Sequence, residues 1–265
     1  RDGRSPLLWR EQGLGEELLL SSLVPEIARR AARCVLECEP RLEALLRRSF
    51  PAVEVVAAGY PPHPATAARG IDWHAPIGDL APLLRPTLAS FPAAPAYLRA
   101  DPVRVRVWRE RLAALGAGPK IGVCWRSGNT RGVRALACTH IEQWLPVLRT
   151  PGAAFVNLQY DHCEHELAQA RLLTGRPIAS FPELDMRNDL DETAALIAAL
   201  DLVVSAPTTV SILAGALGTR TWQLSCGADW HALGQPGSPW QPRLRRFYRR
   251  WDQGWEPILQ EVAAS

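Results

Sequence analysis

A strand-to-helix junction in the second half of the chain carries hydroxyl side chains that could bind an anion. The segment "DLVVSAPTTVSILAGALG" (201–218) runs from an apolar, strand-like stretch into an amphipathic stretch that ends at glycine. Pro207 suits the first position of a helix, whose first N–H groups have no partner within the helix. The hydroxyls of Thr208, Thr209 and Ser211 would add further donors. A phosphate site and a buried strand followed by ordinary hydroxyl capping both explain this pattern.

A basic loop follows another strand-like run. In "IGVCWRSGNTRGVRAL" (121–136) the apolar residues give way to glycine, serine and asparagine with Arg126, Arg131 and Arg134. No acid lies nearby in sequence to pair with these arginines, and guanidinium groups bind phosphate oxygens well. The loop therefore predicts a phosphate-binding edge of the sheet.

A glycine turn in the first half leads into a helix that opens with acids. "LLWREQGLGEELLLSS" (7–22) turns through Gly13 and Gly15 and continues with Glu16 and Glu17. The third glycine of a dinucleotide-binding turn is missing, and the carboxylates would repel a phosphate. A carboxylate in a cleft at this place favours a general base, whereas an acid that only complements the helix dipole is the alternative.

The elements that must position these residues alternate between short apolar runs and helical stretches, which predicts parallel sheets with crossover helices. We expect strands at 6–9, 34–39, 53–58, 71–77, 120–126, 153–160, 177–183, 201–206 and 220–225, the last of the chain. We expect helices at 15–32, 40–50, 98–115, 141–148, 163–173, 191–200 and 208–218. The rhythm restarts after a linker near Gly116–Pro119 and predicts two α/β lobes, 1–116 and 117–265, with the tail a candidate for crossing back.

Composition narrows the class of protein. The 265 residues, 47% of them hydrophobic, suffice for two cores, and no apolar run is long enough for a membrane helix. Six cysteines without CxxC spacing indicate buried thiols in a reducing cytoplasm, so we expect a cytoplasmic protein without membrane insertion. The chain opens on Arg1 and has one methionine, Met186, which suggests a piece of a longer polypeptide.

Other chemistry finds less support. Asp189 and Asp191 have the spacing of a metal-binding acid pair, but they precede a helix as capping acids do, so we expect no metal. The basic stretch "RLRRFYRR" (243–250) could bind nucleic acid, but it lacks an interleaved recognition motif, and a solvated surface or an acidic partner explains it better. A Walker sequence and a GxSxG elbow are both missing from the chain.

Taken together, the chain resembles the glycosyltransferase-like domain of bacterial tetratricopeptide-repeat proteins, which is itself similar to heptosyltransferases with the two-lobed GT-B fold. The matching segments are "LLWREQGLGEELLLSSLVPEIARRAARCVLECEPRL", "KIGVCWRSGNTR", "FVNLQY", "DETAALIAALDLVVSAPTTVSILAGALG" and "ADWHALGQPGSPWQPRLRRFYR". They span nearly the whole chain in the right order. The fold implied is GT-B-like, with two Rossmann-like lobes, parallel sheets and a cleft between them.

The resemblance also implies a function. It predicts an inverting, metal-independent transfer of a sugar from a nucleotide-diphosphate donor, held mainly by the second lobe, to an acceptor facing the first, without a cofactor. Glu16 matches the aspartate that serves as catalytic base in heptosyltransferases, and Arg126, Arg131 and Arg134 match groups that bind the diphosphate. A protein acceptor, recruited by an upstream repeat domain, follows from the same analogy.

Further positions carry both a functional and a structural interpretation. Gln159 and Tyr160, at a strand end, are candidates to bind the base or ribose, or residues that only pack there. Asp229 and Trp230, with Trp240, resemble family positions beside the cleft, although tryptophan is as often a core residue.

The junction departs from the family pattern. The family has Asp-Thr-Gly or Asp-Thr-Ser followed three residues later by histidine, where this chain has Pro207, Thr208, Thr209 and Ile212. A catalytically degenerate domain that binds a nucleotide sugar or presents a protein surface, and a nucleic-acid site in the basic tail, are therefore the alternatives to an enzyme.

Overall fold

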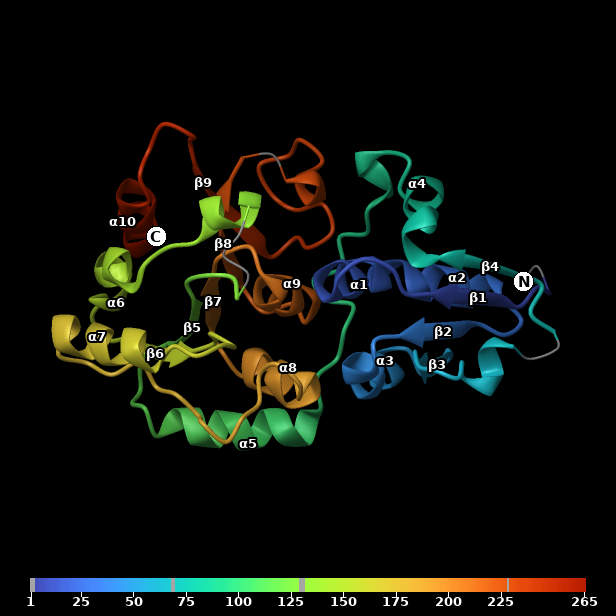
Figure 1. Ribbon diagram of the computed structural model, residues 1–265, viewed down its shortest axis with the longest axis horizontal. Helices are drawn as coiled ribbons and strands as arrows, with labels where there is room; N and C mark the ends of the chain where they lie inside the picture. Colours follow the sequence, from blue (N-terminus) through green and yellow to red (C-terminus); the bar gives the residue numbers. More distant parts are fainter. Residues whose placement is uncertain (1–2, 68–69, 129–131, 228) are drawn as a thin grey trace.

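The computed structural model describes residues 3–67, 70–128, 132–227 and 229–265, which form two α/β lobes placed end to end (Figure 1). The first lobe contains a four-stranded sheet in the order β3-β2-β1-β4. Its strands are β1 (Pro6–Trp9), β2 (Val35–Cys38), β3 (Glu54–Ala57) and β4 (Trp73–Pro76). Its helices are α1 (Leu14–Leu20), α2 (Val24–Arg30), α3 (Glu43–Ser49) and α4 (Ala81–Leu84).

The second lobe contains a five-stranded sheet in the order β6-β5-β7-β8-β9. Its strands are β5 (Lys120–Cys124), β6 (Ala154–Asn157), β7 (Leu202–Ser205), β8 (Thr221–Cys226) and β9 (Leu244–Arg249). The helices around it are α5 (Pro102–Ala113), α6 (Leu145–Leu148), α7 (Glu164–Thr174), α8 (Leu190–Ala198), α9 (Thr209–Ala216) and α10 (Glu256–Ala264). All pairings between these named strands are parallel, so the predicted α/β architecture with two parallel sheets is confirmed.

Local sequence accounts for where the helices begin and end. Asp101 caps α5 by accepting from the N–H groups of Val103 and Arg104, and a proline takes the first helical position. Gly175 ends α7 with φ 71°, a conformation that costs glycine little. Because these signals lie within a few residues of the helix ends, the sequence predicted the bounds of most elements to within a few residues.

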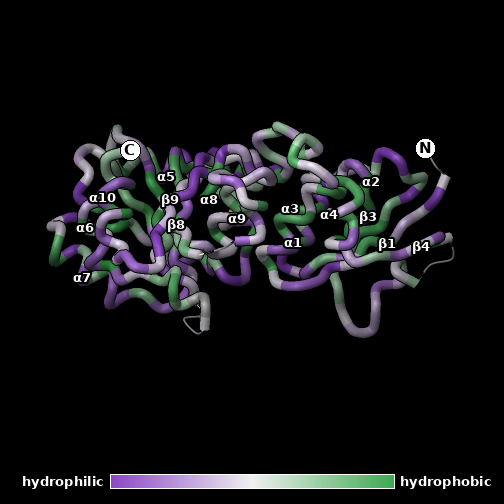
Figure 2. The backbone as a smooth tube through the Cα atoms, turned by 90° about the horizontal axis from the view of Figure 1, so that it is seen from above, coloured by the Kyte–Doolittle hydropathy of each residue, from purple (hydrophilic) through white to green (hydrophobic). Residues whose placement is uncertain are grey.

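The cores of the two lobes are joined. One hydrophobic cluster includes Leu18 and Leu46 of the first lobe and Leu196 and Leu213 of the second, because α1 packs on α9 and α3 packs on α8. A separate cluster, which includes Trp144 and Phe247, fills the second lobe further from the first. Figure 2 shows the two lobes along the long axis, with hydrophobic segments mainly inside each. The shared core holds the lobes in a defined orientation.

The chain passes between the lobes ahead of α5, which packs along α8 through an ion pair of Arg104 with Glu192 (2.5 Å) and a hydrogen bond from Trp108 to Glu192 (2.7 Å). The last helix, α10, packs against α6 and β9 of the second lobe rather than crossing back to the first (Figure 1). The division of the chain at residue 116 stays a prediction.

Three local expectations were wrong. The segment 177–183 forms a single bridge, Ala179 with Val156, instead of a strand. The strand at 221–226 is not the last of the chain, because β9 follows it. The arginine-rich sequence of β9 obscures the alternation that is typical of a strand. Pro207 precedes the N-cap residue Thr208 instead of opening the helix, because α9 starts at Thr209.

The prediction of buried thiols is confirmed for Cys34, Cys38 and Cys124. Burial raises the pKa of the Cys34 thiol to about 11 and the pKa values of the Cys38 and Cys124 thiols to about 12. Such thiols stay protonated and unreactive. In the part of the chain that the structure describes, we find no helix with the length and apolar character needed to cross a bilayer.

Candidate functional site

The amino ends of α1 and α9 meet between the lobes. A Cβ atom on Gly15 would lie 2.9 Å from Cδ1 of Ile212 and 3.8 Å from the Thr209 hydroxyl, so this position needs glycine for the close approach. The next residue, Glu16, is partly exposed at this contact. Its Oε2 lies 2.9 Å from the place where a Cβ on Gly13 would stand, so the carboxylate folds back over the glycine turn. The turn and the junction that the sequence singled out are therefore neighbours.

A pocket of about 140 Å³ opens beside this contact, with walls from both lobes. Leu14 and Arg41 line it from the first lobe, and Tyr160, Arg187 and Thr209 line it from the second. The structure thus brings together two of the predicted donor-binding residues, Tyr160 and Thr209. The two arginines were missed because neither follows a strand end with a recognisable loop motif.

The two arginines of this pocket also connect the lobes. Arg41 donates through one terminal nitrogen to the backbone oxygen of Arg187 (2.9 Å) and through Nε to Glu39 (2.8 Å). The pocket therefore combines two arginines, a tyrosine ring and threonine hydroxyls with an apolar wall, and these groups suit a ligand that has both an aromatic base and an anionic part. The apolar wall consists of Leu14, Met186, Leu190, Val210 and Leu213.

The hydroxyls of Thr208 and Ser211 are used within the cap of α9. Thr208 Oγ1 accepts from the N–H of Val210 (3.3 Å), and Ser211 donates to the backbone oxygen of Thr208 (2.8 Å). Both residues are buried. The capping interpretation therefore accounts for these two residues, whereas Thr209 is the hydroxyl residue of the junction that lines the pocket.

Arg126 has acidic partners, so the expectation that it lacks one was wrong. It bonds to Glu166 at 2.9 and 2.5 Å, pairs with Asp161, and donates to the backbone oxygen of His162 (3.0 Å). The hydrogen bonds to Glu166 hold the pKa of Arg126 above its usual range, against the effect of burial. These acids come from the next strand end and from α7, more than 30 residues away, where sequence proximity could not reveal them.

The other two arginines of the basic loop give no structural test. Arg131 lies outside the described residues, and so does the side chain of Arg134, whose backbone belongs to the 3-10 helix Gly132–Ala137. Their diphosphate-binding role stays a prediction.

Gln159 and its neighbour Tyr160 differ in their surroundings. The buried Gln159 side chain donates to the backbone oxygen of Arg126 (3.0 Å) and to Asp161 (2.8 Å), as a residue that packs strand ends would. Tyr160 is partly exposed, and its hydroxyl accepts from the N–H of Gly128 (3.0 Å) while the residue lines the pocket. Of the two, Tyr160 is the one placed to contact a ligand.

A second polar group comes from the segment between β8 and β9. Asp229 Oδ1 lies 3.2 Å from Nδ1 of His231, and its Oδ2 lies 3.1 Å from a terminal nitrogen of the buried Arg246. Trp230 is half-exposed, with its ring centroid 4.0 Å from that of His231. Burial lowers the pKa of His231, with Arg246 in the same direction, while Asp229 and Glu16 oppose it. Gln241, in the same segment, donates to the backbone oxygen of Ile212 (2.7 Å), the α9 residue that lies against Gly15.

His231 and Arg246 were not among the predicted site residues. Arg246 was assigned to a basic surface stretch, yet it lies in β9 with its side chain 1% exposed. Its neighbour Arg245 packs over Phe247, and Arg249 packs over Trp255. The arginines of this stretch thus have partners within the fold.

The acid pair considered for metal binding serves other contacts. Asp189 caps α8 by accepting from the N–H of Glu192 (2.9 Å), and Asp191 forms a bidentate ion pair with Arg48 of the first lobe (2.7 Å). The second contact helps to hold the lobes together.

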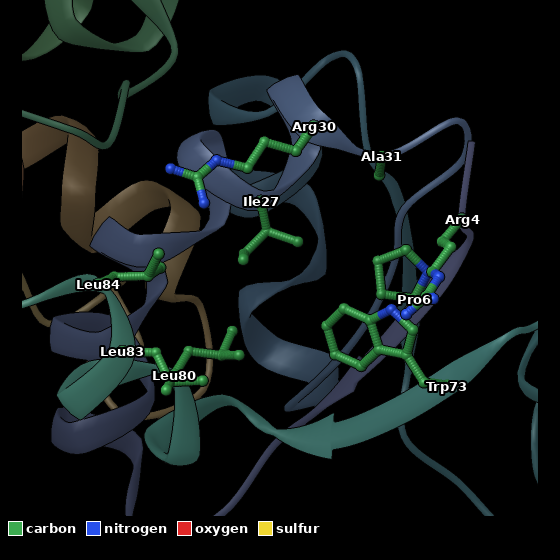
Figure 3. Close-up of a pocket in the computed structure, with 9 residues that line it drawn as sticks. All are labelled: Arg4, Pro6, Ile27, Arg30, Ala31, Trp73, Leu80, Leu83 and Leu84. Carbon is green, nitrogen blue, oxygen red and sulfur yellow. The ribbon is translucent and has the colours of Figure 1, made fainter. Parts of the chain in front are cut away.

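Another pocket, of about 330 Å³, lies in the first lobe at the amino-terminal start of β1, away from the contact between α1 and α9. Figure 3 shows Ile27, Trp73 and Leu80 around it, with Arg4 and Arg30 beside them. Because its walls come from one lobe, it does not share the position between the lobes that is expected of the donor site.

Comparison with known proteins identifies the fold. No protein-family model matches the chain. Protein FlbA of Caulobacter vibrioides is 39% identical over 275 residues, which cover 99% of this chain and 46% of FlbA, so the chain spans about half the length of this curated relative.

Three solved structures are similar over nearly the whole chain. Escherichia coli ADP-heptose lipopolysaccharide heptosyltransferase II has a TM-score of 0.66 at 14% identity, with 98% of each chain covered. The family 9 glycosyl transferase of Veillonella parvula has a TM-score of 0.61 at 10% identity, covering 99% of this chain and 91% of its own. Escherichia coli heptosyltransferase WaaC with ADP-2-deoxy-2-fluoro heptose has a TM-score of 0.55 at 14% identity, covering 98% and 96%. The chain therefore has the GT-B fold that these glycosyltransferases share.

Proposed function

We propose that this chain is a glycosyltransferase domain that transfers a sugar from a nucleotide-diphosphate donor to an acceptor hydroxyl. The observation that carries the proposal is the contact of Gly15, next to Glu16 on the first lobe, with the α9 junction of the second lobe, beside the pocket that both lobes line. In a two-lobed fold, this is where a group that activates an acceptor and a site that holds a donor face each other.

The donor side of the proposal uses the pocket between the lobes, whose volume of about 140 Å³ holds only part of a nucleotide sugar, so the rest of the donor would lie outside it. Tyr160 would contact the base or ribose, and Arg41, Arg187 and Thr209 would face the phosphates. A nucleotide sugar is the ligand class supported by the similar fold of WaaC, which is described with an ADP-heptose analogue. Arg126 would act indirectly, by holding the basic loop through Asp161 and Glu166.

The chemical step would invert the anomeric centre. Glu16 takes the proton of the acceptor hydroxyl while that oxygen attacks the anomeric carbon from the side opposite the phosphate. The bond from the anomeric carbon to the phosphate oxygen breaks, and its electron pair leaves with the nucleoside diphosphate. Guanidinium and N–H groups would stabilise the charge of the leaving group, so the mechanism requires no metal ion. A polypeptide acceptor, recruited by a repeat domain, is part of the same proposal.

Isothermal titration and transfer assays test this function. A panel of nucleoside diphosphates and their sugar conjugates should include one that binds and, with an acceptor, is turned over. Glu16→Gln should lower kcat by about 10²–10⁴-fold and leave the donor Kd within about twofold, because only the base is lost. Glu110→Gln, on the exposed face of α5, is the matched control. Binding of no member of the panel, or full turnover by Glu16→Gln, would contradict the proposal.

A catalytically inactive nucleotide-sugar-binding domain is the second candidate. It is favoured by the α9 junction, where Ile212 is apolar and the hydroxyls of Thr208 and Ser211 serve the cap. This alternative predicts binding of a nucleotide with no transfer or hydrolysis by wild type and no effect of Glu16→Gln.

A further inference from the structure

A groove of about 630 Å³ in the first lobe shares no lining residue with the pocket between the lobes. Its walls come from three segments: residues 22–29, which include most of α2, residues 49–53 at the end of α3, and residues 85–99. The last of these, called the strap below, leads from α4 toward the second lobe (Figure 1). The proposed transfer of a sugar uses none of these walls.

The strap is anchored on the second lobe at two places. The ring of Phe91 packs against that of Trp240 with the centroids 4.8 Å apart, and the N–H of Tyr97 donates to the backbone oxygen of Ala216 (3.0 Å). Between these anchors, the main chain of residues 92–96 makes no hydrogen bond within the described part of the chain. The groove therefore has a fixed edge with unpaired backbone groups, to which an extended chain could bind.

Arg85 brings a largely buried positive charge into the wall of the groove. Its side chain is 6% exposed, and Nη1 donates to Glu26 (2.8 Å) and to the backbone oxygen of Leu84 (2.7 Å). Among the described residues, Nε and Nη2 have no hydrogen-bond partner. These two nitrogens form the edge of a guanidinium that binds a carboxylate through two parallel hydrogen bonds. Arg85 thus keeps this edge for a further anion.

The helical wall beside Arg85 carries further polar groups. Ser22, Glu26 and Arg29 follow one another at helical spacing and all line the groove. Over the ranges that the structure describes, the buried hydroxyl of Ser22 has no hydrogen-bond partner. Glu26 is shared by Arg85 and Arg30, and the hydrogen bond from Arg85 is the main cause that lowers the pKa of Glu26. The only acid of this wall is therefore ionised and already paired.

The charge of the groove is mainly positive. Arg29, Arg85 and Arg99 line it together with the single carboxylate of Glu26. Arg29 and Arg99 are exposed, and neither forms an ion pair with another described residue. The remaining walls include the apolar side chains of Pro25, Phe50, Val53, Pro92 and Leu98. A ligand with both acidic and apolar groups matches this surface.

We propose that the groove binds an extended acidic segment of a polypeptide that also carries apolar side chains. One carboxylate of the segment receives two hydrogen bonds from Arg85, others lie near Arg29 and Arg99, and its main chain pairs with residues 92–96 of the strap. The unpaired main chain and the separation of the arginines favour a polypeptide over a small phosphorylated molecule. The proposal goes beyond the proposed function, because peptide binding requires neither a donor nor transfer.

Fluorescence anisotropy with two labelled peptides tests the groove. One peptide interleaves Asp and Glu with Leu and Phe, and the other has Asn and Gln at the acidic positions. The whole chain should bind the acidic peptide at least about tenfold more tightly. The double variant Arg29→Gln/Arg99→Gln should weaken this binding by about tenfold and leave the neutral peptide unaffected. Arg106→Gln/Arg109→Gln, two exposed arginines of α5, is the matched control and should change the affinity by less than about twofold.

Two further variants separate the bidentate contact from general charge. Arg85→Lys keeps the charge but loses the planar edge, and it should weaken the acidic peptide by about tenfold. Ala94→Trp, at an exposed position of the strap, narrows the groove without changing its charge or touching Glu26, and it should weaken both peptides.

Equal affinity for the two peptides, an unchanged affinity in Ala94→Trp, or an equal loss in the α5 control would overturn the proposal. Binding of inorganic phosphate in place of the acidic peptide would assign the groove to a small anion and overturn it as well. Titration with donor nucleotides is a separate measurement. Failure of peptide binding therefore leaves the transferase intact, and failure of donor binding leaves the groove intact.

Discussion

Arg126 and Arg246 both lie in the second lobe, and they use their guanidinium groups differently. Arg126 follows β5 and bonds to two carboxylates and a backbone oxygen. Arg246 lies in β9 with its side chain 1% exposed, pairs with Asp229, and keeps an Nε without a hydrogen-bond partner among the described residues. The nitrogens of Arg126 are all hydrogen-bonded within the fold, whereas Arg246 belongs to a buried group in which some polar atoms have no hydrogen-bond partner among the described residues.

The difference shows why an arginine after a strand is a weak indicator of a ligand site. A guanidinium surrounded by acids would have to give up those partners to bind a phosphate, and this exchange gains little. The more informative feature is a buried polar atom whose hydrogen bond is missing, since folding alone does not explain its cost.

The largest expected effect on stability comes from removing Arg126, whose nitrogens are all hydrogen-bonded within the fold. Arg126→Ala leaves Asp161 and Glu166 side by side without their cation, and we expect the free energy of unfolding to fall by about 2–3 kcal/mol. Urea denaturation followed by circular dichroism measures the change. Arg171→Ala, an exposed arginine on α7, should cost less than about 0.5 kcal/mol. Equal losses in the two variants would show that the Arg126 network is not structural.

Two adjacent acids of α1 allow the same distinction in the first lobe. The buried Glu17 accepts from the N–H of Glu39 (2.7 Å) and from Arg10 (3.1 Å), and burial raises its pKa despite these bonds. Glu17→Ala should lower the free energy of unfolding by about 2 kcal/mol, because both donors lose their acceptor. Glu17→Gln should recover most of this loss, since it keeps an acceptor without the buried charge.

Glu16→Ala provides the contrast to Glu17→Ala. Because Glu16 is partly exposed, its removal should change the free energy of unfolding by less than about 0.5 kcal/mol while abolishing transfer. A destabilisation of Glu16→Ala equal to that of Glu17→Ala would favour a purely structural acid at the start of α1.

The smallest effect is a pH dependence of stability from His231. Burial lowers its pKa below the ordinary value of 6.5, so the unfolded chain binds a proton more readily than the folded protein. Its contribution is complete above about pH 6.5 and is lost as the pH falls through the interval between the unfolded and folded pKa values. Unfolding free energies at pH 7.5 and 5.5 should differ more in wild type than in His231→Gln, with His165→Gln resembling wild type.

The sequence analysis was most successful where the information is local. The apolar runs at 6–9, 120–124 and 202–205 are strands, and the glycine turn and the Thr208 junction were both placed at strand ends that do face each other. Strand β9 was missed because arginines occupy both exposed and buried positions, Arg245 and Arg246 among them, and the strand pattern then reads as a charged stretch.

The individual site residues could not be assigned in the same way. Tyr160 and Thr209 line the pocket, but the two arginines that join them there, Arg41 and Arg187, follow no motif. His231 is part of a segment that the resemblance indicated, yet its pairing with Asp229 depends on how the segment folds.

The amino-acid sequence by itself determined the alternation of strands and helices, the two parallel sheets and the acidic glycine turn, because hydrophobic period, caps and breakers act within a few residues. Only the tertiary structure decided which charges are neutralised, which hydroxyls are consumed by capping, and which polar atoms are left over. Those outcomes depend on contacts between residues that lie 40 to 197 positions apart in the examples of Arg126 with Glu166 and Gly15 with Ile212. The fold brings these residues together through burial, which sequence spacing does not encode.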